Sequence, residues 1–139
     1  MGTHSKILAL SFVILMAIAS SCSKYEDGPK FSLLSKKKRI SRVWKVEYSI
    51  NLATQVEHSA DFADWLLDFG SDGSYTYTTI YKQLKTTTNG NWELIGDTQL
   101  KLNYSTASGE QIVFYTILRL TKKELWLKNE FEEIHYYND

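Results

Sequence analysis

The hydrophobic residues begin to alternate with polar ones at residue 43, where residues 43–50 read VWKVEYSI. Every second side chain of this stretch is large and apolar, and the side chains between them are charged or polar. The apolar positions are Trp44, Val46, Tyr48 and Ile50. A period of two is typical of a β-strand that buries one face. The stretch therefore predicts a half-buried strand with these four side chains on one face.

Short segments of the same kind follow one another towards the C-terminal end. They are residues 65–69, 74–81, 86–88, 91–95, 99–104, 111–120, 125–127 and 131–137. Residues typical of tight turns separate them, and Asn89-Gly90 is a dipeptide that favours a hairpin turn. Because parallel strands need long crossover connections, which we do not find between these segments, we expect neighbouring strands to be antiparallel.

A meander of this length leaves two open edges unless it closes on itself. We therefore predict an all-β domain over residues 35–139, an antiparallel up-and-down barrel of about eight strands with a short N-terminal helix. The candidate helix covers residues 31–42, with Ser32 or Ser35 as its cap. Four basic residues, 36–39, lie near its start and oppose the helix dipole, which favours a short helix. We interpret them as a solvated face, with a patch for anionic lipids as the alternative.

The N-terminal segment has the composition of a targeting signal. Residues 7–19 are apolar except for Ser11, Lys6 precedes them, and small residues follow. This order is typical of a secretory signal peptide. Thirteen residues rise about 20 Å as a helix, too little for a hydrocarbon core of about 30 Å. We therefore expect the segment to be cleaved.

Cys22 is the only cysteine of the chain and follows this segment directly. The run Ile18-Ala19-Ser20-Ser21-Cys22 resembles the lipobox of bacterial lipoproteins, in which the cysteine is acylated and becomes the first residue. The resemblance implies a lipoprotein signal peptide over residues 1–21, a tether over 22–34, and a membrane anchor through the lipid on Cys22. The alternative is an ordinary signal peptide that happens to end near a cysteine.

Four short pieces of the domain carry a second resemblance. They are Trp44-Lys45-Val46, the hairpin of residues 69–75, Gly90-Asn91-Trp92, and Leu120-Thr121 with Leu125-Trp126-Leu127. In this order and spacing they are similar to the small lipocalin-like lipoproteins of Bacteroidetes. The resemblance implies a lipocalin-like barrel in the cell envelope, anchored by lipid to the outer membrane on its periplasmic or its surface-exposed side. It implies no activity.

Composition excludes several classes of function. The 139 residues hold 16 basic and 16 acidic side chains, so the chain has no net basic field for nucleic acid. A single cysteine forms neither an internal disulfide nor a cysteine-based zinc site. No phosphate loop or dinucleotide fingerprint is present, and we predict no cofactor and no metal. His58 lies among acidic residues, but a polar loop explains it better than a metal site.

The aromatic residues are the best candidates for a binding site. Tyr75, Tyr77 and Tyr81 alternate on one face, and Tyr75 and Tyr77 could line a cavity together with Trp92 and Phe114. Core packing together with surface aromatics also explains these residues, and we favour that interpretation. Glu133 and His135 share a strand face, an arrangement used in acid–base catalysis and equally in ordinary hydrogen bonding. We favour the hydrogen bond and expect no enzyme.

The sequence favours a lipid-anchored barrel that binds a small hydrophobic or amphipathic ligand. The alternative is a structural or protein-interaction module of the cell envelope with a solid core and no ligand. An apolar interior above about 300 Å³ would support binding. An interior filled by side chains would support the solid core, and the candidates to fill it are Trp44, Tyr48, Leu102 and Phe114.

Overall fold

The computed structural model describes residues 35–62 and 64–139. The predicted signal peptide, the tether and Cys22 lie outside the described residues. Among the helices of the described ranges, none is both long and apolar enough to cross a bilayer.

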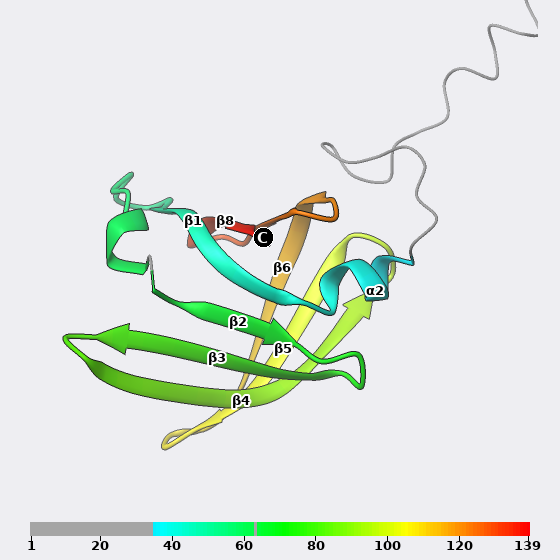
Figure 1. Ribbon diagram of the computed structural model, residues 1–139, viewed down its shortest axis with the longest axis horizontal. Coiled ribbons are helices and arrows are strands. Elements are labelled where there is room, and N and C mark those ends of the chain that lie inside the picture. Colours follow the sequence, from blue (N-terminus) through cyan, green and yellow to red (C-terminus); the bar gives the residue numbers. More distant parts are fainter. Residues whose placement is uncertain (1–34, 63) are drawn as a thin grey trace, which may run out of the picture.

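The described chain forms a closed antiparallel barrel of eight strands (Figure 1). The strands are β1 (Val43–Asn51), β2 (Leu66–Phe69), β3 (Ser74–Tyr81), β4 (Leu84–Ile95), β5 (Gln99–Thr106), β6 (Gly109–Leu120), β7 (Glu124–Lys128) and β8 (Glu132–Tyr137). Each strand pairs with the next in sequence, and β8 pairs with β1 to complete the ring. The predicted up-and-down barrel is confirmed.

Two short helical segments lie at opposite ends of the barrel (Figure 1). The 3-10 helix η1 (Ser59–Phe62) lies in the connection between β1 and β2, and α2 (Lys36–Ile40) precedes β1. Ser35, one of the two residues predicted as the cap, caps α2. Its side chain accepts a hydrogen bond from the backbone N–H of Lys38. Ile40 is fully buried, and its carbonyl accepts a 2.8 Å bond from the indole N–H of Trp44. The helix therefore closes one end of the barrel.

The interpretation of residues 36–39 as a solvated face holds for Lys37 and Lys38, which are exposed, and is wrong for Lys36 and Arg39. Lys36 forms a 2.6 Å ion pair with Asp97, and the ammonium group of Lys37 lies 6.0 Å from the ring centre of Trp92. Arg39 is only 6% exposed and donates a 3.0 Å hydrogen bond to the carbonyl of Leu120. These side chains hold the helix on the barrel.

The predicted turn at Asn89-Gly90 is also wrong, because β4 runs straight through this dipeptide. The chain reverses instead at Lys82-Gln83, between the paired residues Tyr81 and Leu84. Gly90 lies opposite Tyr75 of β3, and a Cβ atom at residue 90 would come within 2.7 Å of the Tyr75 ring. The glycine is needed for this close approach inside the sheet, so it is not available to make a turn.

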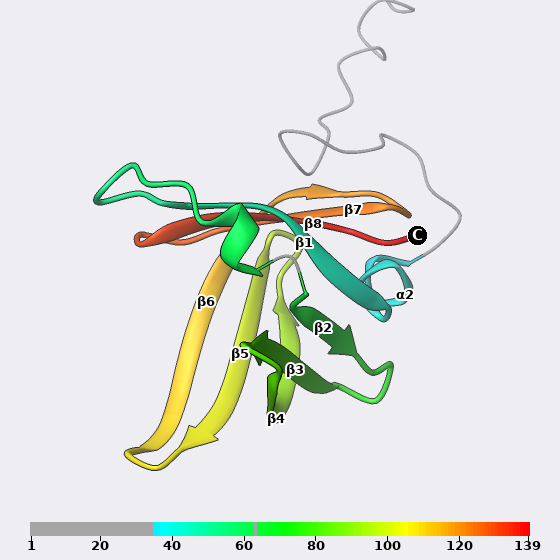
Figure 2. The same cartoon turned by 60° about the vertical axis from the view of Figure 1, so that its left-hand side comes forward.

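The barrel wall is incomplete at the end opposite α2. Strand β6 pairs with β7 only from Thr116 onwards, so its first half has a partner in β5 alone. Strand β4 likewise pairs with β5 only from Gly90 to Ile95. Figure 2 shows the β5–β6 hairpin extending away from β7 and β8. At this end β4 and β6 therefore each lack a backbone partner on one side.

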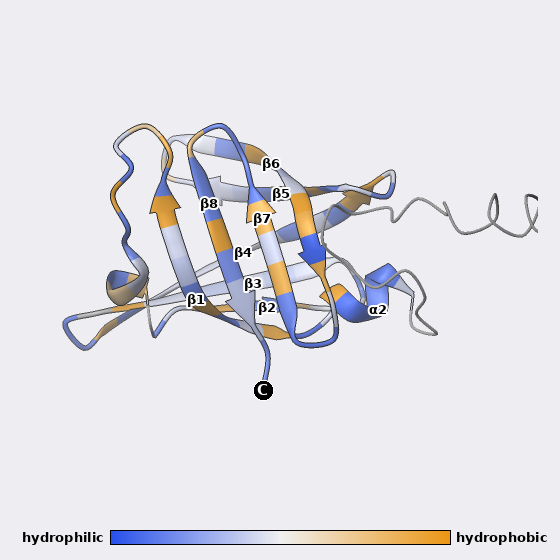
Figure 3. Cartoon of the chain, turned by 90° about the horizontal axis from the view of Figure 1, so that it is seen from above, coloured by the Kyte–Doolittle hydropathy of each residue, from blue (hydrophilic) through white to orange (hydrophobic). Residues whose placement is uncertain are grey.

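Hydrophobic and hydrophilic residues alternate along β7 and β8, as expected for a barrel wall with a packed inner face (Figure 3). A register shift between Val46 and Tyr48 interrupts the alternation of β1. Val46 lies inside the barrel, but Tyr48 pairs with His135 on the outer face and Ser49 takes the next buried position. The prediction that Tyr48 shares a face with Trp44 is therefore wrong, because a β-bulge changes which face a side chain occupies.

Candidate ligand site: a cavity in the barrel

The barrel encloses a cavity of about 400 Å³ that extends as far as η1. Its aliphatic wall consists of Val46, Leu67, Leu102, Val113, Leu127 and Ile134. Aromatic residues make up most of the rest, namely Phe62, Trp65, Tyr75, Tyr77, Tyr104, Tyr115 and Tyr136. The polar remainder is Thr79, Thr88 and Glu132. An apolar wall with a few convergent polar groups is the usual composition of a small-molecule site.

The period of two places these side chains in the interior. Tyr75 and Tyr77 are alternate residues of β3, and Val113 and Tyr115 are alternate residues of β6. The closed end beyond them is filled by fully buried side chains such as Trp44 and Leu100. The cavity is the part of the interior that this packing leaves open.

Two of the four predicted ligand-lining residues, Tyr75 and Tyr77, line the cavity. Trp92 is buried but belongs to the closed end, where it packs edge-on against Phe69 and donates a 2.8 Å hydrogen bond to the carbonyl of Gly70. Phe114 lies on the outer face and is 51% exposed. Its two chain neighbours line the cavity, and consecutive strand residues point to opposite faces. Trp92 and Phe114 are therefore not among the lining residues.

Sequence reasoning missed Tyr104, Tyr115, Tyr136 and Glu132. Tyr104 continues the alternation of Leu100 and Leu102, so the spacing could have found it. For Tyr115 the pattern was ambiguous, because both faces of β6 carry apolar residues. Glu132 belongs to a short acidic stretch with Glu130 and Glu133, and nothing in that stretch indicates which of the three carboxylates borders a cavity.

A hydrogen bond crosses the cavity wall where β6 and β7 separate. The Tyr115 hydroxyl donates to Oε1 of Glu132 at 2.6 Å. Burial raises the pKa of Tyr77, Tyr115 and Tyr136 well above the usual value, and the negative charge of Glu132 raises each of them further. Burial also raises the pKa of Tyr75, to about 12. These phenols therefore remain neutral hydrogen-bonding groups near neutral pH.

Trp65 contributes an unsatisfied donor. Its ring packs on Phe62 at 4.1 Å between centroids and meets Tyr77 edge-on at 5.6 Å. The indole Nε1–H is buried and has no hydrogen-bond partner among the described residues. A buried polar group without a partner is costly, so this N–H is a local cost of packing the Trp65 ring against Phe62 and Tyr77.

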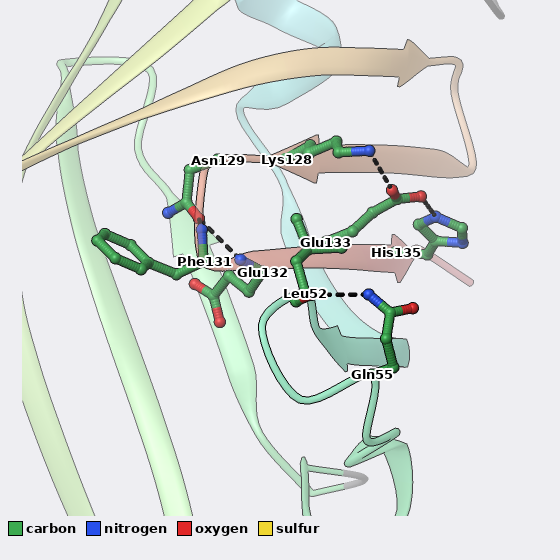
Figure 4. Close-up of polar contacts among 8 residues, drawn as sticks. All are labelled: Leu52, Gln55, Lys128, Asn129, Phe131, Glu132, Glu133 and His135. Carbon is green, nitrogen blue, oxygen red and sulfur yellow. Dashed lines mark hydrogen bonds and ion pairs between the residues drawn. The ribbon is translucent and has the colours of Figure 1, made fainter.

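Glu133 and His135 share a face, as predicted, but this face is outside the barrel. The His135 ring stacks on Trp126 at 4.1 Å, and its Nε2 lies 2.9 Å from Oε1 of Glu133. Glu133 also pairs with Lys128 at 3.2 Å (Figure 4). Although burial opposes it, hydrogen bonds from His135 and Lys128 lower the pKa of Glu133 below its ordinary value. Neither Glu133 nor His135 lines the cavity.

No model of a known protein family matches the chain. No curated protein sequence matches it either. Solved structures with the same fold include two from Bacteroides species. A lipocalin-like protein from Bacteroides uniformis has a TM-score of 0.61 at 16% identity, and the match covers 73% of this chain and 99% of that one. An uncharacterised protein from Bacteroides eggerthii has a TM-score of 0.56 at 14% identity, over 70% of this chain and 98% of that one. The barrel is thus lipocalin-like, as the sequence resemblance implied.

Proposed function

We propose that this protein is a membrane-anchored lipoprotein whose lipocalin-like barrel binds a small hydrophobic or amphipathic ligand in its interior. The cavity of about 400 Å³ carries the proposal, because it exceeds the lower size of typical ligand sites. Two of the side chains that could have filled a solid core, Tyr48 and Phe114, lie on the outer face instead. This arrangement favours a binding protein over a structural module without a ligand.

The chemistry of the wall fits an apolar molecule with a polar end. Burial of apolar surface supplies about 25 cal/mol per Å² and drives the ligand into the cavity. The hydroxyls of the lining tyrosines then orient it through hydrogen bonds. The incomplete wall beside β6 gives the ligand a route from solvent, since Tyr104, Val113, Tyr115 and Glu132 border both the cavity and an outer groove.

A pair of neighbouring substitutions tests the binding site. Val113→Trp fills the cavity, whereas Phe114→Trp adds a similar bulk on the outer face. Native mass spectrometry identifies any molecule that co-purifies, and calorimetric titration with decanol measures the affinity of the barrel for an apolar probe. We expect Val113→Trp to weaken decanol binding at least about tenfold and Phe114→Trp to leave it nearly unchanged. Equal binding by both variants, or no binding by the parent protein, would contradict the proposal.

The anchor is proposed on the sequence alone, from the lone cysteine that follows the signal pattern. Stable attachment to a membrane by lipid takes about two acyl chains, and a bacterial lipoprotein typically carries more than one on its cysteine. We expect Cys22→Ser to release the protein from the membrane fraction of the cell envelope. A variant that still sediments with membranes would show that something else holds the protein there.

A further inference from the structure

Two neighbouring carboxylates on β8 have different surroundings. Glu133 lies on the outer face between Lys128 and His135, and Glu132 extends in the opposite direction (Figure 4). Glu132 lines the cavity, where it accepts the hydrogen bond from Tyr115. Within the described part of the chain it has no ion pair. Glu132 is thus a carboxylate at an apolar cavity without a positive partner.

None of the other described lining residues of the cavity is a lysine, an arginine or a histidine. Glu132 also borders two outer grooves, one with Lys128 and one with His58, but Lys128 pairs with Glu133 and His58 with Asp61. The carboxylate of Glu132 lies 2.6 Å from the hydroxyl of Tyr115, another lining residue, so its negative charge stands at the cavity wall. Charges interact more strongly in a protein interior than in water. A ligand carboxylate placed here would meet a like charge and lose its hydration, whereas a ligand cation would meet an opposite charge.

Aromatic rings favour the same sign of charge. Tyr77 and Tyr115 both line the cavity and both interact with Glu132. The face of a tyrosine ring carries partial negative charge and attracts a cation within about 6 Å of its centre. An ammonium group near Glu132 would therefore have a carboxylate and aromatic rings as neighbours.

We propose that the cavity selects apolar ligands that carry an ammonium group, with Glu132 as the counter-ion, over ligands that carry a carboxylate. This inference rests on the proposed function, because it concerns the same cavity. It names the chemical class of ligand that the interior can accept.

Three probes that share one chain and differ in the polar end test the selection. They are decylammonium, decanol and decanoate, titrated into the parent protein by calorimetry at one low salt concentration. We expect decylammonium to bind about tenfold more tightly than decanol, and decanoate to bind most weakly. This ranking needs no variant, so it tests the proposal even if a substitution impairs folding.

Glu132→Gln removes the charge and keeps the shape, and Glu133→Gln makes the same change on the outer face. We expect Glu132→Gln to abolish the preference for decylammonium over decanol, so that the ratio of the two affinities falls about tenfold. Glu133→Gln should retain the full preference. Binding of decanol without preference for the ammonium probe, or a preference that survives Glu132→Gln, would overturn this inference alone. Failure of all three probes to bind would contradict the proposed function itself.

Discussion

Gly90 shows how one residue can serve packing where its sequence context suggests a turn. A Cβ atom at this position would collide with the carbonyl oxygen of Asn103 and lie 2.7 Å from the ring of Tyr75. The absence of a side chain lets Tyr75 lie across β4 and point into the cavity. A glycine in the interior of a strand often marks such a close approach.

We predict that Gly90→Ala destabilises the protein by about 2 kcal/mol, because the backbone oxygen of Asn103 cannot yield as a flexible side chain could. The free energy of unfolding from urea titration measures the effect. Gly96→Asn is the matched control, since Gly96 has a φ of 60° that asparagine tolerates and has open space around it. If the two variants were equally stable, the packing role of Gly90 would be wrong.

Neighbouring residues of β6 illustrate why the lining was only partly predictable. Val113 and Phe114 are both apolar, so the composition of the strand does not say which of them faces inwards. The pairing with β5 decides it, since Val113 lies opposite the buried Leu102. Leu102 and Val113 lie on different strands, so the hydrophobic pattern within β6 alone cannot predict that they pair.

At the scale of the element, the β3–β4 hairpin reverses on residues that are unusual for its geometry. Lys82 and Gln83 have φ values of 47° and 68°, in the left-handed region that favours glycine and asparagine. A two-residue hairpin loop with two positive φ values corresponds to a type I′ turn. Pairing of the flanking strands from Ser74 to Tyr81 therefore dictates where the chain turns, against the preference of the loop residues.

We predict that Lys82→Asn combined with Gln83→Gly stabilises the protein by about 1 kcal/mol, because the new residues adopt the required conformation with less strain. The urea midpoint should rise without a change in its slope. Gln83→Ala, which keeps a Cβ atom at the strained position, should give no gain. An unchanged midpoint for the double variant would show that this turn is not strained.

At the scale of the whole molecule, the barrel has a packed end and an open end. The first end is closed by α2 together with Ile40 and Trp44, and the second is open where the hairpins separate.

The buried tyrosines of the interior make the free energy of unfolding depend on pH. Their pKa values are raised in the folded protein, whereas a tyrosine in the unfolded chain titrates near pH 10.

We predict that these tyrosines leave the free energy of unfolding unchanged below about pH 10. Above about pH 10 they lower it as the pH rises. In that range the unfolded chain has released protons that the folded protein still holds, so rising pH favours unfolding. The free energy of unfolding should drop by about 3 kcal/mol between about pH 10 and 11, about 1 kcal/mol for each of the three tyrosines. Tyr77→Phe should reduce this drop, and Tyr137→Phe, a change outside the cavity, should not. A drop of the same size in Tyr77→Phe would contradict the assignment.

The alternation that begins at Trp44 and the short turns determined, from the sequence alone, an antiparallel barrel of about eight strands, because a period of two and a tight turn are local properties of the backbone. Only the tertiary structure decided which faces line the cavity. The bulge that moves Tyr48 outwards and the strand that runs through Gly90 depend on pairing between distant segments. Glu132 and Glu133 look alike in the sequence, and the closure of the barrel places one inside and the other outside.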